Sequence, residues 1–267
     1  MPDFRVHCPA AAASSTQLAL SPDESHHLIV VNRARLGDPV VAFDGAGREW
    51  LTVVASDRKN AAVLRVVSTR AHAPLPFHLT LAQVLPKGPA MDAVVRQATE
   101  IGAAAILPLA GDRSQVHFEG DRSDRKVDKW HVAALEAAKQ CGNPFVPAIA
   151  PVQPAAAFIA ATSVPDSADD RAFDLKLIAS LPKGARPLRA VLDDFRAAHG
   201  RSPRRVLWLI GPEGDFSPVE HALAHTHGFL PVTLGPLVLR CDTAAAYALA
   251  ITSYELSHAP ASAEPAA

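Results

Sequence analysis

The spacing of hydrophobic positions changes near residue 73 of the chain. Before it, short runs rich in β-branched residues at 40–43, 50–54 and 62–67 are separated by polar turns, which predicts strands. Ser21-Pro22-Asp23-Glu24 has the composition of a helix start and stands directly before the apolar run 28–31. We therefore expect a small β-rich domain over residues 1–72.

After a proline-rich linker at 73–76, apolar runs alternate with longer amphipathic stretches. This alternation predicts an α/β domain over 77–258, with a mainly parallel sheet covered on both faces. We expect strands near 77–83, 104–108, 174–180, 205–210 and 231–234, and helices near 90–101, 126–140, 186–198, 218–226 and 242–256. The polar segment 163–171 is expected to be a mobile surface loop, and the tail 259–267 to be disordered.

Composition limits the function classes. The 267 residues are 49% hydrophobic and 20% charged, enough for a packed core, and the net charge of −1 requires any nucleic-acid contact to come from local basic patches. The three cysteines have no disulfide or zinc spacing, and we see no signal peptide or membrane helix. We expect a soluble protein of the reducing cytoplasm.

Two glycine-bearing loops carry the candidate chemistry. The first loop, residues 211–217, follows the apolar run 205–210. It ends at Ser217, which with Glu220 three residues later has the pattern of a helix start. The second loop, residues 234–240, follows another short predicted strand. Two such turns at the carboxyl ends of neighbouring strands form a crevice in which α/β sheets bind ligands. Neither loop has the spacing of a P-loop or of a dinucleotide fingerprint.

These loops resemble the RsmE family, SPOUT-superfamily methyltransferases that methylate N3 of a uridine in 16S ribosomal RNA. The resemblance rests on Leu209-Ile210-Gly211-Pro212-Glu213-Gly214, Phe216-Ser217, Leu234-Gly235-Pro236, Leu239-Arg240 and Thr243-Ala244, and it spans nearly the whole chain. Asp215 stands where the family usually has a second glycine, Cys241-Asp242 where it usually has Thr-Glu, and Asn143 where it often has Arg.

The resemblance implies a fold and an assembly. It implies a SPOUT-type parallel sheet with a C-terminal trefoil knot, which no local pattern could reveal, and an N-terminal PUA-like β-barrel that holds RNA. It also implies a homodimer, and the alanine-rich last helix offers small residues for close packing.

The resemblance further implies S-adenosylmethionine as the cofactor. We expect its adenine among Leu181, Ile210, Leu234 and Leu239, with main-chain groups of the two motifs holding it; these are Gly211, Gly214, Gly235, Pro236, Thr243 and Ala244. Arg240 is the best candidate for the cation that stabilises the base once its N3 proton leaves. Asp242 or Glu213 orients Arg240 or takes the proton, and the sequence does not choose between them.

Candidate RNA-binding residues are His27, Arg33, Arg35, Lys87 and Arg113. Arg33 and Arg35 flank a predicted helix end, where cations also complement the helix dipole whatever their function. Arg113 stands in a polar loop beyond a strand end, where site residues gather in this architecture. The histidines at 221, 225 and 227 invite a metal hypothesis, but a helix presents histidines to solvent at little cost, and we expect no metal.

Two other functions remain open at this point. Another SPOUT activity, such as ribose 2′-O-methylation, would need no pocket for a base edge. A non-catalytic RNA-binding assembly factor would have kept the fold and lost the donor site. The presence of both glycine loops and Arg240 favours the methyltransferase.

Overall fold

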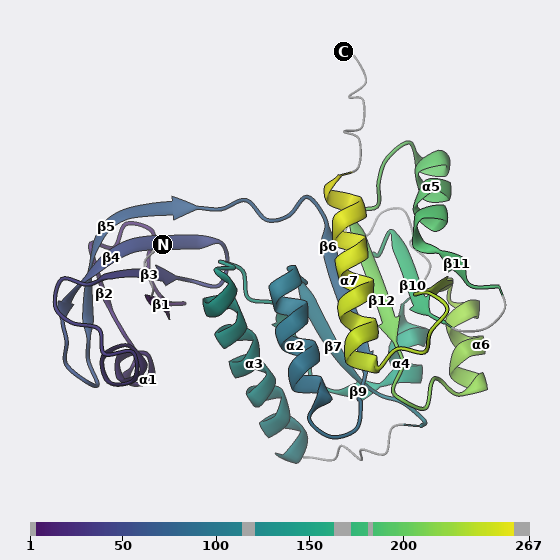
Figure 1. Ribbon diagram of the computed structural model, residues 1–267, viewed down its shortest axis with the longest axis horizontal. Coiled ribbons are helices and arrows are strands. Elements are labelled where there is room, and N and C mark those ends of the chain that lie inside the picture. Colours follow the sequence, from purple (N-terminus) through teal and green to yellow (C-terminus); the bar gives the residue numbers. More distant parts are fainter. Residues whose placement is uncertain (1–3, 114–120, 163–171, 181–183, 259–267) are drawn as a thin grey trace, which may run out of the picture. The chain divides into compact units, whose positions relative to one another are not determined.

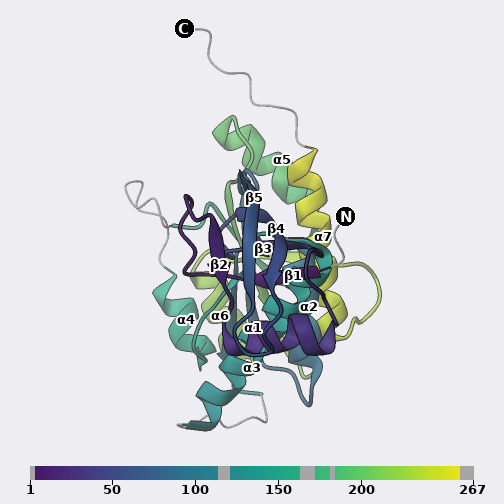
Figure 2. The same ribbon diagram turned by 90° about the vertical axis from the view of Figure 1, so that its left-hand side faces the viewer.

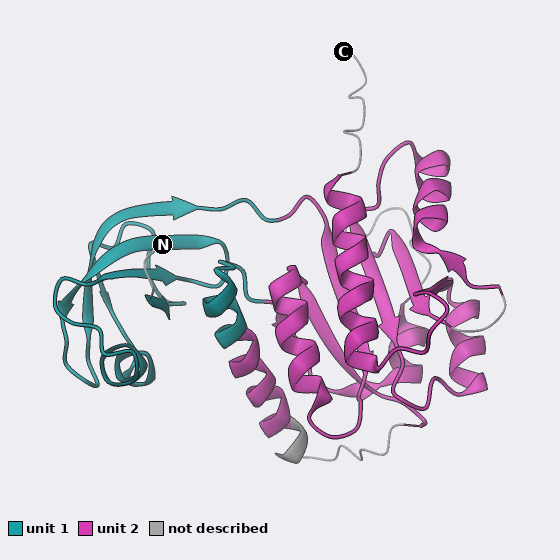
Figure 3. Cartoon of the chain, in the orientation of Figure 1, with its two compact units in different colours: residues 1–74, 135–146 teal, residues 75–134, 147–267 magenta. Residues whose placement is uncertain are grey.

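The computed structural model describes residues 4–113, 121–162, 172–180 and 184–258. The chain divides into two compact units, residues 1–74 with 135–146 and residues 75–134 with 147–267 (Figure 3). The division after Pro74 falls in the predicted linker. The expected loop at 163–171, the expected disordered tail and Leu181 lie outside the described residues.

The first unit is built on a five-stranded sheet in the order β1-β3-β4-β5-β2 (Figure 2). The bounds are β1 Phe4–His7, β2 Gln17–Ala19, β3 Pro39–Phe43, β4 Arg48–Ser56 and β5 Val63–Ala71. The three predicted strands are confirmed as β3, β4 and β5. Strands β1 and β2 were missed because three or four residues are too few to show an alternating pattern. Trp50, Leu28 and Leu64 form the centre of this unit's core.

The predicted helix start is confirmed in this unit. Helix α1 (Pro22–His26) begins after Ser21, whose side chain accepts a hydrogen bond from the main-chain nitrogen of Glu24. The apolar run continues as a π-helical turn, η1 (His27–Val31), and buries Leu28. Arg33 follows with φ of +60°, a left-handed conformation that non-glycine residues seldom adopt.

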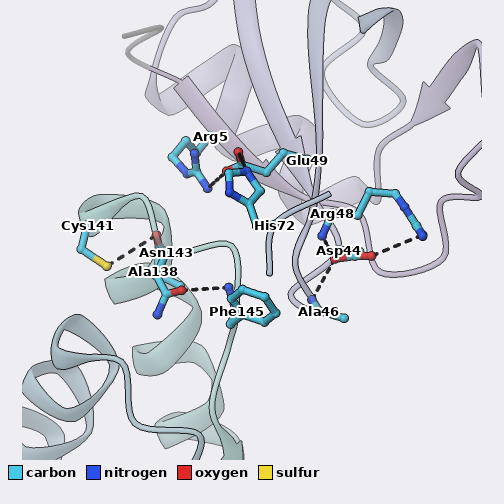
Figure 4. Close-up of polar contacts among 10 residues, drawn as sticks. All are labelled: Arg5, Asp44, Ala46, Arg48, Glu49, His72, Ala138, Cys141, Asn143 and Phe145. Atoms are coloured by element: carbon cyan, nitrogen blue, oxygen red, sulfur yellow. Dashed lines mark hydrogen bonds and ion pairs between the residues drawn. The ribbon is translucent and has the colours of Figure 1, made fainter. Parts of the chain in front are cut away.

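Residues 135–146, which we had assigned to the second domain, belong to the first unit. Lys139 pairs with Glu24 at 2.6 Å, and the main-chain nitrogens of Gly47 and Val146 donate to the carbonyls of Pro144 and Gly45. Figure 4 shows the neighbouring turns, which are closed by Asp44 and Asn143, and the Arg5–Glu49–His72 ion cluster. This attachment depends on long-range pairing and so left no local signal.

The second unit is a parallel sheet in the order β11-β13-β10-β12-β6-β7-β8, with β9 also paired to β7. Helices α2 and α7 pack together on one face, and α4 and α6 lie on the other (Figure 1). The strands are β6 His78–Val84, β7 Ala105–Ala110, β8 Ala148–Ile149, β9 Gln153–Pro154, β10 Leu175–Ala179, β11 Arg186–Pro187, β12 Arg205–Ile210 and β13 Leu230–Thr233. The helices are α2 Ala90–Ile101, α3 Asp121–Cys141, α4 Ala155–Ala161, α5 Leu188–His199, α6 Pro218–Thr226 and α7 Cys241–Ser257; α3 begins in this unit and ends in the first.

The five strands and five helices predicted for this domain are confirmed, and one detail of their order is corrected. The strands that precede the two glycine loops, β12 and β13, are not immediate neighbours, because β10 lies between them. The carboxyl end of β10 therefore joins the crevice.

Candidate active site

A cleft lies at the carboxyl ends of β10, β12 and β13. It holds about 630 Å³ of empty space, part of which is open solvent. Its lining comes from both glycine loops, the end of β10 and the start of α7: Ala179, Ser180, Ile210, Gly211, Pro212, Glu213, Asp215, Leu234, Gly235, Leu237, Val238, Leu239, Cys241 and Ala244. We call this the donor cleft.

Seven of the residues that we proposed from the two motifs line the donor cleft: Ile210, Gly211, Glu213, Leu234, Gly235, Leu239 and Ala244. Gly214 and Pro236, in the two loops, and Thr243, in the first turn of α7, are outside the lining. Sequence reasoning missed Ala179, the last residue of β10, and Ser180, which follows it. It also gave no role to five lining residues inside the motif segments: Pro212, Asp215, Leu237, Val238 and Cys241. Only the order of the strands could have shown Ala179 and Ser180, whereas Cys241 stood inside a recognised motif.

Gly235 gives the cleft one of its open walls. Its φ is +115°, a conformation that residues with a Cβ rarely adopt, and a Cβ built there meets no protein atom within 4 Å. Gly235 lines the cleft, so the cleft wall is open at this position and a side chain there would meet only strain in the backbone.

Glu213 links three segments around the cleft. Its carboxylate oxygens accept from the main-chain nitrogen of Lys87 at 3.1 and 3.2 Å, and Oε1 lies 3.9 Å from the Cys241 thiol. The side-chain amide of Gln83 on β6 also holds this loop, because it donates to the carbonyls of Ile210 and Gly211 at 3.4 and 3.3 Å. The first glycine loop is thus tied to the carboxyl end of β6 and to the start of α7.

The Cys241 thiol is held in its neutral form. Burial, followed by the negative charge of Glu213, raises the pKa of Cys241 to about 11. A protonated thiol can donate a weak hydrogen bond to the Glu213 carboxylate and presents no nucleophile to a bound electrophile.

Arg240 and Asp242 flank Cys241 at the start of α7. Arg240 is the N-cap residue, its side chain makes no capping bond and it is exposed. Asp242 lies in the first helical turn, where the helix dipole favours a carboxylate. Both residues are therefore at the rim of the cleft and outside its lining.

Two of the proposed RNA-binding cations lie against the first glycine loop. The Arg113 guanidinium donates to the carbonyl of Gly214 at 2.9 Å, and the main chain of Lys87 binds Glu213; both side chains are exposed. The other three proposed residues, His27, Arg33 and Arg35, lie on and just after η1 in the first unit, where the two arginines are exposed. The structure therefore divides the five candidates between the two units.

His221 of α6 makes contacts with its own loop. His221 lies 3.7 Å from the Asp215 carboxylate and meets the Phe216 ring edge-on. Over the part of the chain that the structure describes, no cluster of three or more His, Cys, Asp or Glu residues could hold a metal ion. Within the same residues, no helix has the length and apolar character needed to cross a membrane.

Comparison with known proteins shows to which family this chain belongs. Residues 73–253 match a family model described as an RNA methyltransferase domain, and residues 20–67 match an RNA methyltransferase PUA domain. The ribosomal RNA small subunit methyltransferase E of Synechocystis is 30% identical over 87% of this chain and 71% of its own length. The chain belongs to the ribosomal RNA small subunit methyltransferase E family.

Solved structures extend the family likeness to the fold. A Legionella pneumophila protein described as a methyltransferase in complex with the cofactor SAM is 30% identical, with a TM-score of 0.80 over 94% of this chain and 97% of that one. The ribosomal RNA small subunit methyltransferase E of Neisseria gonorrhoeae, bound to S-adenosyl methionine, is 25% identical, with a TM-score of 0.79 over 94% of this chain and 97% of that one.

Proposed function

We propose that the protein methylates N3 of a specific uridine in 16S ribosomal RNA of the small subunit, with S-adenosylmethionine as the methyl donor. The observation that carries this proposal is the donor cleft, because both motif loops of the family line it and Arg240 is exposed at its rim. Three free thiols, Cys8, Cys141 and Cys241, suit a site of action in the reducing cytoplasm.

The residues of the cleft fit this donor. Ile210, Leu234 and Leu239 supply apolar surface for an adenine ring, and the open space beside Gly235 lets the donor approach the main chain closely. When bound, S-adenosylmethionine supplies a methyl carbon that is electrophilic because it is attached to a sulfonium. The protein's task is then to align this carbon with the uracil nitrogen and to exclude water.

Arg240 would act on the acceptor. As the N3 proton leaves, negative charge develops on the uracil, and a guanidinium at the rim of the cleft stabilises that charge. Between the two acidic candidates, we favour Asp242 as the group that orients Arg240 or takes the proton. The carboxylate of Glu213 is already engaged by the main chain of Lys87 and by Cys241.

RNA binding would use cations of both units. In the second unit, Lys87 and Arg113 lie against the loop that lines the cleft, so they suit phosphates close to the target nucleotide. In the PUA-like unit, His27, Arg33 and Arg35 suit further contacts with the RNA, and Arg33 keeps a strained backbone at an exposed position. A base inside folded RNA must be splayed out at a cost of a few kcal/mol, and such contacts offset that cost.

We also propose the trefoil knot and the homodimer. The path of the chain supports the knot: β13 lies beyond β10, yet α7 packs on β12 and β6, so residues 234–240 must cross back over the sheet.

Exposed apolar side chains support the dimer, because Leu237, Val238, Tyr247 and Tyr254 are 71, 80, 47 and 61% exposed on the second loop and α7. Sedimentation at nanomolar concentration tests it, and a fully active monomer would contradict it.

The test of the reaction uses the purified protein, S-adenosylmethionine, and small subunits from a strain that lacks the corresponding enzyme. Mass spectrometry of the digested RNA should show one new N3-methyluridine. A 2′-O-methylated nucleotide would instead identify the other SPOUT activity. Absence of S-adenosylmethionine binding in calorimetry, together with retained RNA binding, would identify a non-catalytic assembly factor.

A further inference from the structure

A second network of hydrogen bonds lies beside the donor cleft, at the start of α6. Glu220 is only 2% exposed, and its two carboxylate oxygens accept from the main-chain nitrogens of Asp112 at 3.0 Å and Ser217 at 2.8 Å. The Ser217 hydroxyl accepts from the Glu220 nitrogen at 3.1 Å and donates to the Asp112 carboxylate at 2.8 Å. A capping box usually serves its own helix. This one extends to the loop after β7, more than one hundred residues away in sequence.

The contact between these segments is tight. A Cβ at Gly111 would lie 2.7 Å from a methyl carbon of Val84 and 3.1 Å from Oε1 of Glu220, so only glycine allows this approach. A buried carboxylate is costly unless donors satisfy it, and here two main-chain N–H groups and the helix N-terminus do so. The loop after β7 is thereby fixed against α6.

Arg113 directly follows the residue that is held in this way. Its guanidinium donates to the Gly214 carbonyl of the first glycine loop at 2.9 Å. A guanidinium has five N–H donors, and this bond uses one of them on an exposed side chain. The network thus fixes the backbone next to Arg113, through Asp112, while the bond to Gly214 holds the Arg113 guanidinium.

We propose that Asp112, Ser217 and Glu220 are positioning residues that fix Arg113 against the first glycine loop, where it binds a phosphate of the target nucleotide or its neighbour. This inference rests on the proposed RNA methyltransferase function. It adds that the capping network of α6 serves RNA binding through Arg113, rather than the stability of the helix alone.

A double-mutant cycle tests the coupling. Arg113→Ala should raise KM for the RNA substrate about tenfold and change the Kd of S-adenosylmethionine less than twofold. Asp112→Ala should raise the same KM at least threefold. In the Arg113→Ala background, Asp112→Ala should add no further increase, because its effect passes through the arginine. Asp112→Asn should restore KM, since the amide oxygen still accepts from the Ser217 hydroxyl.

A matched control separates positioning from stability. Asp174 also accepts hydrogen bonds from main-chain nitrogens, those of Arg204 and Arg205, but lies at the amino ends of β10 and β12, away from the donor cleft. Asp174→Ala should lower Tm and leave the RNA KM unchanged. The inference would be overturned if Asp112→Ala raised the RNA KM by the same factor in the wild-type protein and in the Arg113→Ala variant. Failure of Asp112→Asn to restore this KM would also overturn it. Failure of the proposed function is distinct, because the wild-type protein would then form no N3-methyluridine.

Discussion

The thiol of Cys241 lies 3.9 Å from Oε1 of Glu213 in the wall of the donor cleft. Burial and the charge of Glu213 raise the pKa of this thiol to about 11. At pH 8 only about one thiol in a thousand is then ionised, and the thiolate is the reactive form. The pair therefore keeps a potential nucleophile inert beside the proposed methyl donor.

We expect Cys241 to react with iodoacetamide much more slowly than exposed Cys141 at pH 8, and to gain reactivity steadily as the pH rises toward 11. Glu213→Gln removes the second cause of the raised pKa and should speed the alkylation of Cys241. Mass spectrometry of time points, on protein shown to remain folded, measures both rates. A Cys241 rate that is already maximal at pH 8 would contradict this account.

The second prediction concerns Gly235. Gly235 lines the donor cleft at a φ of +115°, and a methyl group there would meet no protein atom within 4 Å. Gly235→Ala should therefore weaken S-adenosylmethionine binding at least tenfold, which is about 1.4 kcal/mol. Gly200→Ala is the control, because Gly200 also has a positive φ and open space but caps α5 outside the cleft. Both variants should lose some stability, and calorimetry should show a loss of affinity only in the first. Wild-type affinity in folded Gly235→Ala would refute the placement of the donor.

Local sequence patterns predicted most of the second unit because its strands and helices are long enough to show their period. The run 205–210 is β12, and Ser217 with Glu220 gives the predicted capping box of α6. Helix α4 was missed because its seven residues include no polar side chain, so no amphipathic pattern appears, and no side chain caps it. Strand β11 has two residues and shows no pattern.

The site was predictable where a motif is continuous in the sequence and not where distant strands meet. Ile210, Gly211 and Gly235 came directly from the glycine loops. Ser180 enters the cleft only because β10 pairs with both β12 and β13. The hydrogen bond between Glu213 and the main-chain nitrogen of Lys87 likewise joins residues 126 positions apart. The spacing of hydrophobic residues along the chain cannot predict such a long-range contact.

The third prediction uses the backbone of Arg33, whose φ of +60° costs a non-glycine residue roughly 1–2 kcal/mol. Arg33→Gly should relieve the strain and raise Tm, whereas Arg33→Ala should not. Both variants lose the guanidinium, so both should weaken RNA binding and reduce the log–log salt slope by about one. Thermal unfolding and salt-dependent binding titrations measure the two effects. Unchanged RNA affinity in both variants would show that Arg33 has no role in RNA binding.

The fourth prediction separates catalysis from binding at Arg240. This residue is exposed at the N-cap of α7 and makes no capping bond, so its side chain is not needed to hold the helix start. Arg240→Ala should therefore leave Tm and S-adenosylmethionine affinity nearly unchanged. It should slow single-turnover methylation by a factor of about one hundred or more, or roughly 3 kcal/mol, the effect typical of losing one group that stabilises developing charge.

Measurement with both substrates saturating isolates that step from binding. Arg240→Lys keeps the charge but not the planar fork of donors, and it should recover only part of the rate. Because the guanidinium acts as the uracil proton leaves, the deficit of Arg240→Ala should shrink at higher pH, where more of the free base is already ionised. A single-turnover rate equal to that of the wild type would leave Arg240 as a binding residue only, and the stabilisation of the uracil anion would have to come from another group at the rim of the cleft.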